Sequence, residues 1–148
     1  MNLKNGVGGE ACIIGMMTYI SEEFNEHLEK ELKKRKIPIQ GKHAALFMIL
    51  FMHNNKMEFK EIADMWRKSK STLCDITSRY AEEDLLQKSQ CYLDKRNVYV
   101  GVTEEALKYK DDFDEINRGF LKKASSNLSE EKLGELKFIL VEMMKSFI

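Results

Sequence analysis

The sequence predicts a mainly α-helical protein that carries one small β-hairpin. One proline and eight glycines in 148 residues favour helices over a β-sandwich or a long linker. Hydrophobic residues recur at helical spacing near both ends, which indicates two long amphipathic helices. Between them, residues 59–103 have the order helix, turn, helix, hairpin and helix start, which is typical of a winged helix-turn-helix. The length predicts a single domain over residues 1–148.

The first long helix is predicted over residues 10–36. Lys33 to Lys36 places cations at its C-terminal end, where they suit the helix dipole, and Pro38 then breaks it. A second helix over residues 44–53 is apolar on nearly all sides, so we expect it to be buried. Asn54-Asn55-Lys56 reads as a turn. The apolar stripe of the first helix consists of Ile13, Ile14, Met17, Ile20, Phe24, Leu28 and Leu32.

A DNA-binding region is predicted over residues 44–107, with a helix-turn-helix at its centre. Phe59 to Arg67 forms a short amphipathic helix, and Ser69 is a suitable N-cap for the next one. The inner face of this second helix consists of Leu73, Ile76, Thr77 and Tyr80, and its outward face of Lys70, Ser71, Cys74, Asp75 and Ser78.

The predicted hairpin joins residues 85–88 to the β-type run 98–100 through a polar segment. Thr103 then caps a helix, with Glu104 and Glu105 favourable in its first turn, which we expect to run to about Leu121. Ser129 caps a final helix within residues 123–148. Both terminal helices carry more apolar surface than a small winged helix needs, which predicts that 10–36 and 123–148 are dimerisation helices. The alternative is that they cover the core of a monomer.

Composition excludes several classes of protein. The formal net charge is zero, unlike that of a non-specific nucleic-acid coater, yet residues 67–79 hold four basic side chains against Asp75 alone. No apolar run could span a bilayer and no signal peptide is evident, so we expect a cytoplasmic protein without membrane partners. Three cysteines without CxxC spacing indicate reduced thiols. Isolated histidines and the lack of a phosphate loop predict no enzyme activity, no metal and no cofactor.

The residues of the central region resemble the MarR family of bacterial and archaeal transcription regulators. The resemblance covers residues 59–107 well, and the flanking helices match by length and pattern only. Its most specific part is an Asp-x-Arg before a Val-Thr-Glu helix start. The matching blocks are Glu61-Ile62-Ala63, Ser69 to Leu73, Leu85 to Lys88, Asp94-Lys95-Arg96 and Val102-Thr103-Glu104.

This resemblance implies a triangular homodimer with interlocked terminal helices. Each subunit would offer one recognition helix and one wing to a pseudo-palindromic operator, usually to repress nearby genes until a small molecule or an oxidant releases the DNA. A prokaryotic, nucleoid-associated location follows from the same resemblance. The sequence departs from the family pattern where Arg67-Lys68, Asp84 and Ala106 replace expected residues, glycine among them. A non-glycine residue there can require a left-handed backbone, which Asp tolerates better than most residues.

The predicted DNA-binding residues fall on the second helix and on the hairpin. Hydroxyls and free N–H groups at a helix N-terminus suit phosphate oxygens, although Ser69 can also serve only as a cap. Asp75 either orients Arg79, the interpretation we favour, or accepts a hydrogen bond from a cytosine amino group. The full set is Lys68, Ser69, Lys70, Ser71, Thr72, Cys74, Asp75, Ser78, Arg79, Lys88, Asp94, Lys95 and Arg96.

Arg96 is the residue from which we expect the largest wing contribution. An arginine at a hairpin tip can enter a narrow minor groove, where the negative potential is enhanced. The resemblance gives Asp94 the role of holding that guanidinium, and the alternative is a surface ion pair between the two. Lys88 and Lys95 are expected near phosphates.

Two control mechanisms remain open. The resemblance places a ligand crevice between the dimerisation helices and the winged helix, and five residues could line it or belong to the core. Redox control is the alternative: Cys12 lies in the first helix, and oxidation of Cys74 or Cys91 could block DNA binding. A rival function is a winged-helix protein-interaction module that does not bind DNA, which zero net charge favours. The five candidate pocket residues are Tyr19, Phe24, His43, Phe47 and Met48.

Overall fold

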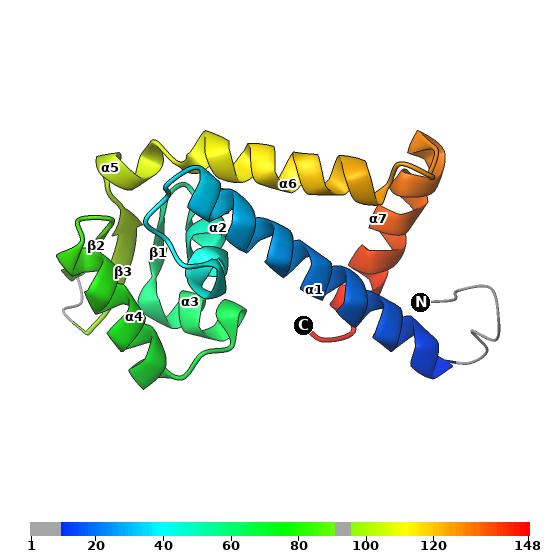
Figure 1. The fold of residues 1–148 in the computed structure, drawn as a ribbon. Coiled ribbons are helices and arrows are strands. Elements are labelled where there is room, and N and C mark those ends of the chain that lie inside the picture. Colours follow the sequence, from blue (N-terminus) through cyan, green and yellow to red (C-terminus); the bar gives the residue numbers. More distant parts are fainter. Residues whose placement is uncertain (1–9, 91–95) are drawn as a thin grey trace. The chain divides into compact units, whose positions relative to one another are not determined.

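The computed structural model describes residues 10–90 and 96–148. They belong to two compact units, Met1–Phe113 and Asp114–Ile148. The predicted fold class, mainly α with a small antiparallel sheet, is confirmed. In chain order the elements are α1 (Glu10–Lys34), the 3₁₀ turn η1 (Gly41–His43), α2 (Ala44–Met52), β1 (Lys56–Glu58), α3 (Phe59–Trp66), α4 (Lys70–Glu82), β2 (Leu86–Gln90), β3 (Val98–Val102), α5 (Glu104–Leu107), α6 (Lys110–Ala124) and α7 (Glu130–Lys145) (Figure 1).

The first helix ends earlier than predicted, and proline is not the direct cause. α1 ends at Lys34, and Lys36 adopts a left-handed backbone with φ 55°. The N–H of Ile37 donates to the carbonyl of Leu32 at 3.0 Å, and the N–H of Lys36 to that of Lys33 at 3.1 Å. These two bonds form a Schellman cap, which closes the helix ahead of Pro38.

The core of the first unit is built around α2. As predicted, this helix is buried: Ala44, Leu46, Phe47 and Leu50 are fully inaccessible to solvent. The Phe47 ring packs edge-on against the ring of Tyr80 from α4, with 5.1 Å between centroids. Burial of each large side chain of this kind contributes about 1.5–3 kcal/mol. α2 therefore provides the support on which α4 lies.

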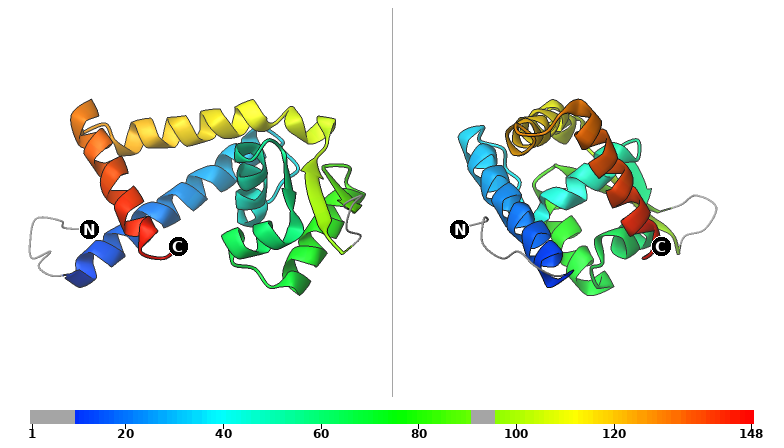
Figure 2. Two further views of the ribbon diagram at one scale, coloured as in Figure 1. Left: turned by 180° about the vertical axis from the view of Figure 1, so that it is seen from behind. Right: turned by 90° about the vertical axis from the view of Figure 1, so that its right-hand side faces the viewer.

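The described strands form one antiparallel sheet in the order β1-β3-β2. The predicted hairpin is confirmed, and β2 pairs with β3 from Leu86↔Val102 to Gln90↔Val98. β1 was missed, because Lys56 was assigned to a turn. Three residues are too few to show alternation, and β1 exists through long-range pairing such as Met57↔Val100. Figures 1 and 2 show α4 beside β2.

Two of the departures from the family pattern occupy left-handed backbone positions. Arg67 ends α3 with φ 52°, and Asp84 follows α4 with φ 61°. After each, an N–H reaches back five residues: Lys68 to the carbonyl of Ala63 at 3.2 Å and Leu85 to that of Tyr80 at 2.9 Å. The turn geometry is thus retained without glycine, at a local cost of the order of 1 kcal/mol per residue.

The helix expected from Thr103 to about Leu121 is interrupted, so that prediction was wrong. α5 ends at Leu107 and α6 begins at Lys110, and the N–H of Tyr109 donates to the carbonyl of Ala106 at 3.0 Å, a 3₁₀-type bond. No proline or glycine lies between Thr103 and Phe113, so nothing local in the sequence marks the break. The predicted cap is confirmed, because Thr103 Oγ1 accepts from the N–H of Ala106 at 3.2 Å.

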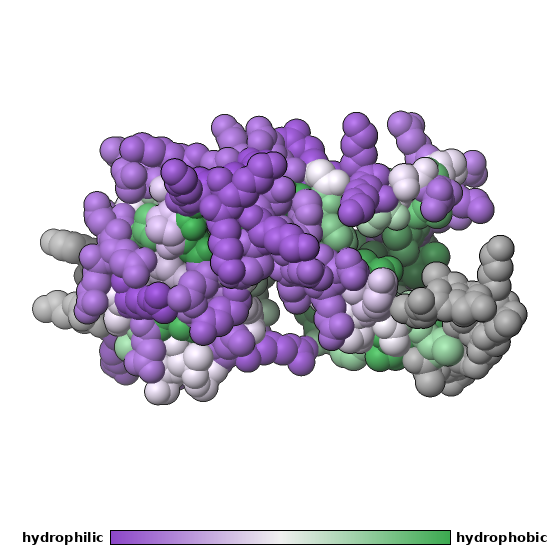
Figure 3. Space-filling model, in the orientation of Figure 1, coloured by the Kyte–Doolittle hydropathy of each residue, from purple (hydrophilic) through white to green (hydrophobic). Residues whose placement is uncertain are grey.

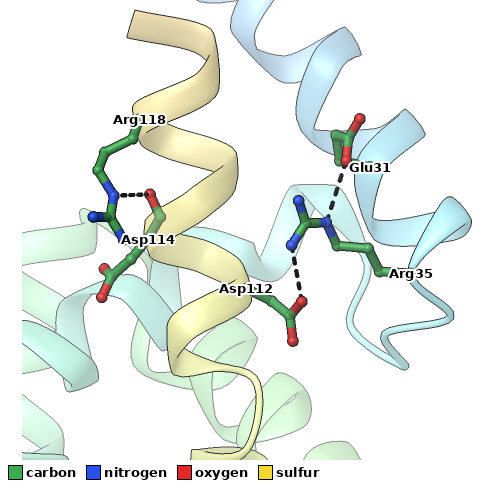
Figure 4. Close-up of polar contacts among 5 residues, drawn as sticks. All are labelled: Glu31, Arg35, Asp112, Asp114 and Arg118. Carbon is green, nitrogen blue, oxygen red and sulfur yellow. Dashed lines mark hydrogen bonds and ion pairs between the residues drawn. The ribbon is translucent and has the colours of Figure 1, made fainter. Parts of the chain in front are cut away.

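An ion-pair cluster fixes the start of α6 within the first unit (Figure 4). Arg35, just beyond α1, bonds Glu31 through Nε at 3.2 Å and Asp112 through Nη1 at 2.9 Å. The side chains of Arg35 and Glu31 are about three-quarters buried, so this pairing is better shielded than a typical surface ion pair. Further along α6, Arg118 Nε donates to the carbonyl of Asp114 at 3.3 Å.

The second unit contains the remainder of α6 and the helix α7. Ser129 caps α7 by accepting from the N–H of Lys132 at 3.2 Å, as predicted. None of the α7 residues is buried, and Figure 3 shows hydrophobic surface over this helix. Among the helices of the described residues, none is long and apolar enough to cross a membrane.

Candidate nucleic-acid interface

The helix α4 has the amphipathic character that a recognition helix requires. Ser69 Oγ accepts from the N–H of Thr72 at 3.1 Å, which satisfies one of the unpaired donors of the first turn. Leu73, Thr77 and Tyr80 are buried on the inner face, in agreement with the prediction. The Thr77 hydroxyl donates to the carbonyl of Leu73 at 2.8 Å, so this polar group is buried without a loss of hydrogen bonding.

The outward face of α4 brings most of the predicted helix residues together at the surface. It combines hydroxyl and cationic donors with one carboxylate in the first two turns. Lys70, Ser71, Thr72, Cys74, Asp75 and Arg79 are exposed and Ser78 is partly exposed, with Lys68 and Ser69 exposed just before the helix.

Lys88 connects the wing strand β2 to this outward face. Its Nζ donates to Ser78 Oγ at 2.7 Å and approaches the carbonyl of Cys74 at 3.4 Å. Lys88 is itself exposed, and these contacts hold its charge beside the helix. The helix and the strand therefore present one continuous polar surface.

Arg79 is held by residues other than Asp75. Its Nε lies 3.5 Å from Glu83 Oε1, and its guanidinium lies over the Tyr80 ring. When the Gln40 amide is oriented with its oxygen toward the guanidinium, that oxygen accepts from Arg79 at 2.9 and 3.1 Å. The favoured interpretation, that Asp75 orients Arg79, is not supported by this geometry.

A polar cluster joins η1 to the C-terminal end of α4. His43 Nδ1 and the Tyr80 hydroxyl lie 2.7 Å apart, and the backbone N–H of Gln40 donates to the same hydroxyl at 3.2 Å. Burial lowers the pKa of His43, and the positive charges of Lys42, Arg79 and Lys68 lower this pKa further. The neutral imidazole can then accept a hydrogen bond from the Tyr80 hydroxyl, so this buried hydroxyl is satisfied. Sequence reasoning missed this cluster, because Gln40 and Tyr80 carry no local signal that they meet.

The structure describes only some of the residues predicted for the wing. Asp94, Lys95 and Cys91 lie outside the described residues. Arg96 is exposed, two residues before β3, in the segment that connects the two strands of the hairpin.

The predicted ligand-pocket residues lie in different environments. Tyr19 is 49% exposed on α1, whereas His43 and Phe47 are buried against Tyr80. Phe24 and Met48 are partly exposed. A ligand pocket formed by these residues stays a prediction.

A surface hollow of about 590 Å³ is lined by residues of the three strands and of the turn before β1. None of the five predicted pocket residues lines it. The Asn55 Oδ1 atom at this hollow is buried and has no hydrogen-bond partner within residues 10–90 and 96–148. The lining residues are Asn54, Asn55, Lys56, Gln87, Lys88, Ser89, Gly101 and Val102.

The two described cysteines differ in exposure. Cys74 is exposed on α4, and its Sγ lies 4.0 Å from Lys88 Nζ, whereas Cys12 on α1 is partly exposed. In the part of the chain that the structure describes, no group of three His, Cys, Asp or Glu residues could hold a metal ion.

Comparisons with known proteins identify the fold. No protein-family model matches the sequence, and no curated protein matches it. Solved structures do match. A MarR transcriptional regulator from Methanosarcina mazei has a TM-score of 0.83 at 16% identity, covering 93% of this chain and 96% of its own. S. aureus MepR in its DNA-binding conformation has a TM-score of 0.79 at 20% identity, covering 92% and 98%.

The MepR–DNA complex also matches, with a TM-score of 0.74 at 19% identity over 94% of this chain and 98% of that one. These similarities extend over nearly the whole chain, including the terminal helices that the sequence matched only by length and pattern. The fold is therefore that of MarR-family transcriptional regulators, as the resemblance predicted.

Proposed function

We propose that this protein is a sequence-specific, double-stranded DNA-binding transcription regulator that acts without catalysis. The observation that carries the proposal is the joint surface of α4 and β2, in which Lys88 connects the wing to the outward face of the helix. A helix of this kind inserts its N-terminal residues into the major groove, and a wing flanks it. The similarity to a MepR–DNA complex supports the same use of the surface.

The proposed active form is a homodimer that represses transcription from a pseudo-palindromic operator. Its support is the apolar surface on the two terminal helices. Monomeric proteins rarely expose large apolar patches, and each of these helices by itself exposes a series of apolar side chains. The exposed side chains are Ile13, Ile14, Met16, Met17, Tyr19 and Ile20 on α1, and Leu136, Phe138, Ile139, Leu140, Val141, Met143 and Met144 on α7.

Release from the operator by a small molecule is the form of control that we propose, as the resemblance of the sequence implies. The candidate pocket residues are Tyr19, Phe24, His43, Phe47 and Met48. A thiol-based switch is the alternative, with Cys12 as the candidate predicted from the sequence. Cys74, which the sequence analysis also named, is exposed on α4.

The proposal is tested by selection of bound sequences from a random duplex library, followed by fluorescence anisotropy across a salt series. We expect a recurrent motif and affinity that falls steeply with salt, because several phosphates are contacted. Arg96→Ala should weaken binding by about 1–3 kcal/mol without unfolding the protein. The matched control is Arg118→Ala, an exposed arginine on α6 in the second unit, which should leave DNA affinity unchanged.

A winged-helix protein-interaction module is the second candidate function. The carboxylate of Asp75 on the outward face of α4 and the formal net charge of zero favour it. Selection that enriches no motif, together with weak binding that does not depend on salt, would replace the DNA-binding proposal with this one.

A further inference from the structure

Asp75 occupies the middle of the surface that α4 presents outward. With 3.6 residues per turn, Ser71 and Asp75 lie opposite the buried stripe of Leu73, Thr77 and Tyr80. Asp75 is the single acidic residue in the first two turns of α4. In helix-turn-helix proteins these N-terminal turns are the ones that reach base edges.

The Asp75 carboxylate is not used within the protein. Within residues 10–90 and 96–148 it makes no hydrogen bond and no ion pair. The nearest structural role, orientation of Arg79, is taken by Glu83 and Gln40. The carboxylate therefore stabilises no described part of the fold. It is able to accept a hydrogen bond from a bound molecule.

The neighbours of Asp75 are hydrogen-bond donors. Lys88 Nζ lies on one flank, bonded to Ser78 Oγ at 2.7 Å. Because Ser78 accepts this bond, its own hydroxyl proton remains able to donate. Lys70 adds a cation in the first turn of the same helix. These positive groups offset part of the repulsion that a carboxylate meets beside phosphates.

The four bases differ in what they offer a carboxylate in the major groove. Guanine presents two acceptors, and thymine an acceptor and a methyl group. Adenine presents an amino donor beside the N7 acceptor, so a carboxylate there meets a lone pair. Cytosine presents its N4 amino group with no acceptor of its own beside it. An ionised carboxylate, which only accepts hydrogen bonds, therefore suits cytosine best.

We infer that Asp75 is a specificity-determining residue that accepts a hydrogen bond from the N4 amino group of one cytosine in the recognised site. This inference rests on the proposed DNA-binding function. Asp75 lowers affinity for DNA in general through repulsion and restores it for sites with cytosine at that position. Its contribution is therefore to discrimination rather than to total affinity.

The test is selection from a random duplex library with the wild-type protein, Asp75→Asn and Asp75→Ala. Anisotropy with four duplexes that differ only at the affected position then gives the preference. We expect the wild type to prefer cytosine by about tenfold, within the range of a single mismatched base pair. Asp75→Asn should shift the preference to adenine, because an amide can pair with both N6 and N7. Asp75→Ala should lose the preference and bind random DNA at least as tightly as the wild type.

Glu82→Gln is the matched control, because it removes the same charge from an exposed residue at the end of the same helix. It should raise affinity for all duplexes alike and keep the cytosine preference. Thermal unfolding followed by circular dichroism should give all three variants a wild-type transition, since both positions are exposed. A wild-type protein that selects no motif contradicts the DNA-binding proposal itself. A wild-type motif that Asp75→Asn and Asp75→Ala leave unchanged at every position overturns the role of Asp75 alone.

Discussion

The helices α2 and α7 are both rich in apolar residues, yet they differ in how far these residues are buried. α2 lies inside the first unit, where four of its side chains are fully buried and Phe47 packs against Tyr80. α7 has no buried residue, and Phe138 is 66% exposed. Most of α2 is covered within one chain, with Met52 at its end exposed, whereas α7 leaves apolar area in water that a second surface could cover. Apolar side chains can thus stabilise the fold in one helix and, in a helix that also carries charged residues, remain available for assembly.

The largest expected effect is on the α2 side of this comparison. Phe47→Ala removes a fully buried ring and leaves a cavity, so the free energy of unfolding should fall by about 3–5 kcal/mol. Urea unfolding measures this loss. Phe138→Ala is the control on α7, and at concentrations low enough to separate a dimer it should cost less than about 1 kcal/mol. Equal losses of unfolding free energy in the two variants would show that the α2 and α7 side chains contribute alike to the stability of one chain.

The next effect concerns assembly through α7. Ile139→Asp places a charge on its exposed apolar surface, and we expect the dissociation constant of the dimer to rise at least about a hundredfold, close to 3 kcal/mol. Sedimentation velocity over a concentration series measures it. Lys137→Ala, a change at an exposed charged residue of the same helix, should leave the dimer intact. A wild-type chain that sediments as a monomer at all concentrations would remove this role from α7.

A smaller effect should come from the two serine N-caps, Ser69 of α4 in the first unit and Ser129 of α7 in the second. Ser69 and Ser129 accept from backbone N–H groups at 3.1 and 3.2 Å, so Ser→Ala at either position should cost about 1 kcal/mol. Only Ser69→Ala should also weaken DNA binding, because its hydroxyl lies at the proposed interface. Unfolding and anisotropy measurements on both variants separate these outcomes. A loss of DNA affinity of equal size in Ser129→Ala would mean that the effect is one of stability alone.

The smallest effect is a pH dependence within the first unit. Burial, followed by Lys42, Arg79 and Lys68, lowers the pKa of His43 below its usual 6.5. Acidification must therefore charge a group that folding keeps neutral. The stability that His43 provides should be complete above about pH 6.5 and be lost as the pH falls through its lowered pKa. Urea unfolding of the wild type and of His43→Gln between pH 5 and 8 measures the difference. Parallel curves for the two proteins would show that His43 does not contribute.

Local patterns allowed much of the fold to be predicted. A nearly continuous apolar run located α2, periodicity located the inner face of α4, and cap residues located the starts of α4, α5 and α7. The replaced glycine at Asp84 indicated a position that can require a left-handed backbone, and Asp84 adopts one with φ 61°. Such features depend on neighbours within a few residues, which the sequence displays directly.

The errors came from features that the local sequence does not display. β1 exists because Met57 pairs with Val100, and the end of α5 has no proline or glycine to mark it. At the candidate interface, the favoured interpretation was that Asp75 orients Arg79 on the same helix. The guanidinium instead meets Gln40, which lies in another part of the chain. Sequence spacing cannot rank partners that only the folded chain brings together.

The Thr103 side chain has a consequence for the entropy of the wing. Its hydroxyl donates to the carbonyl of Asp84 at 2.7 Å, and its backbone N–H donates to that of Leu85 at 3.2 Å. These two bonds join the ends of the segment that runs from the end of α4 to the start of α5, so this segment forms a closed loop in the folded protein. The entropy of that closure is lost when the protein folds, not when it binds. A hairpin anchored in this way can contact a partner at a lower entropic cost than one that must first be positioned.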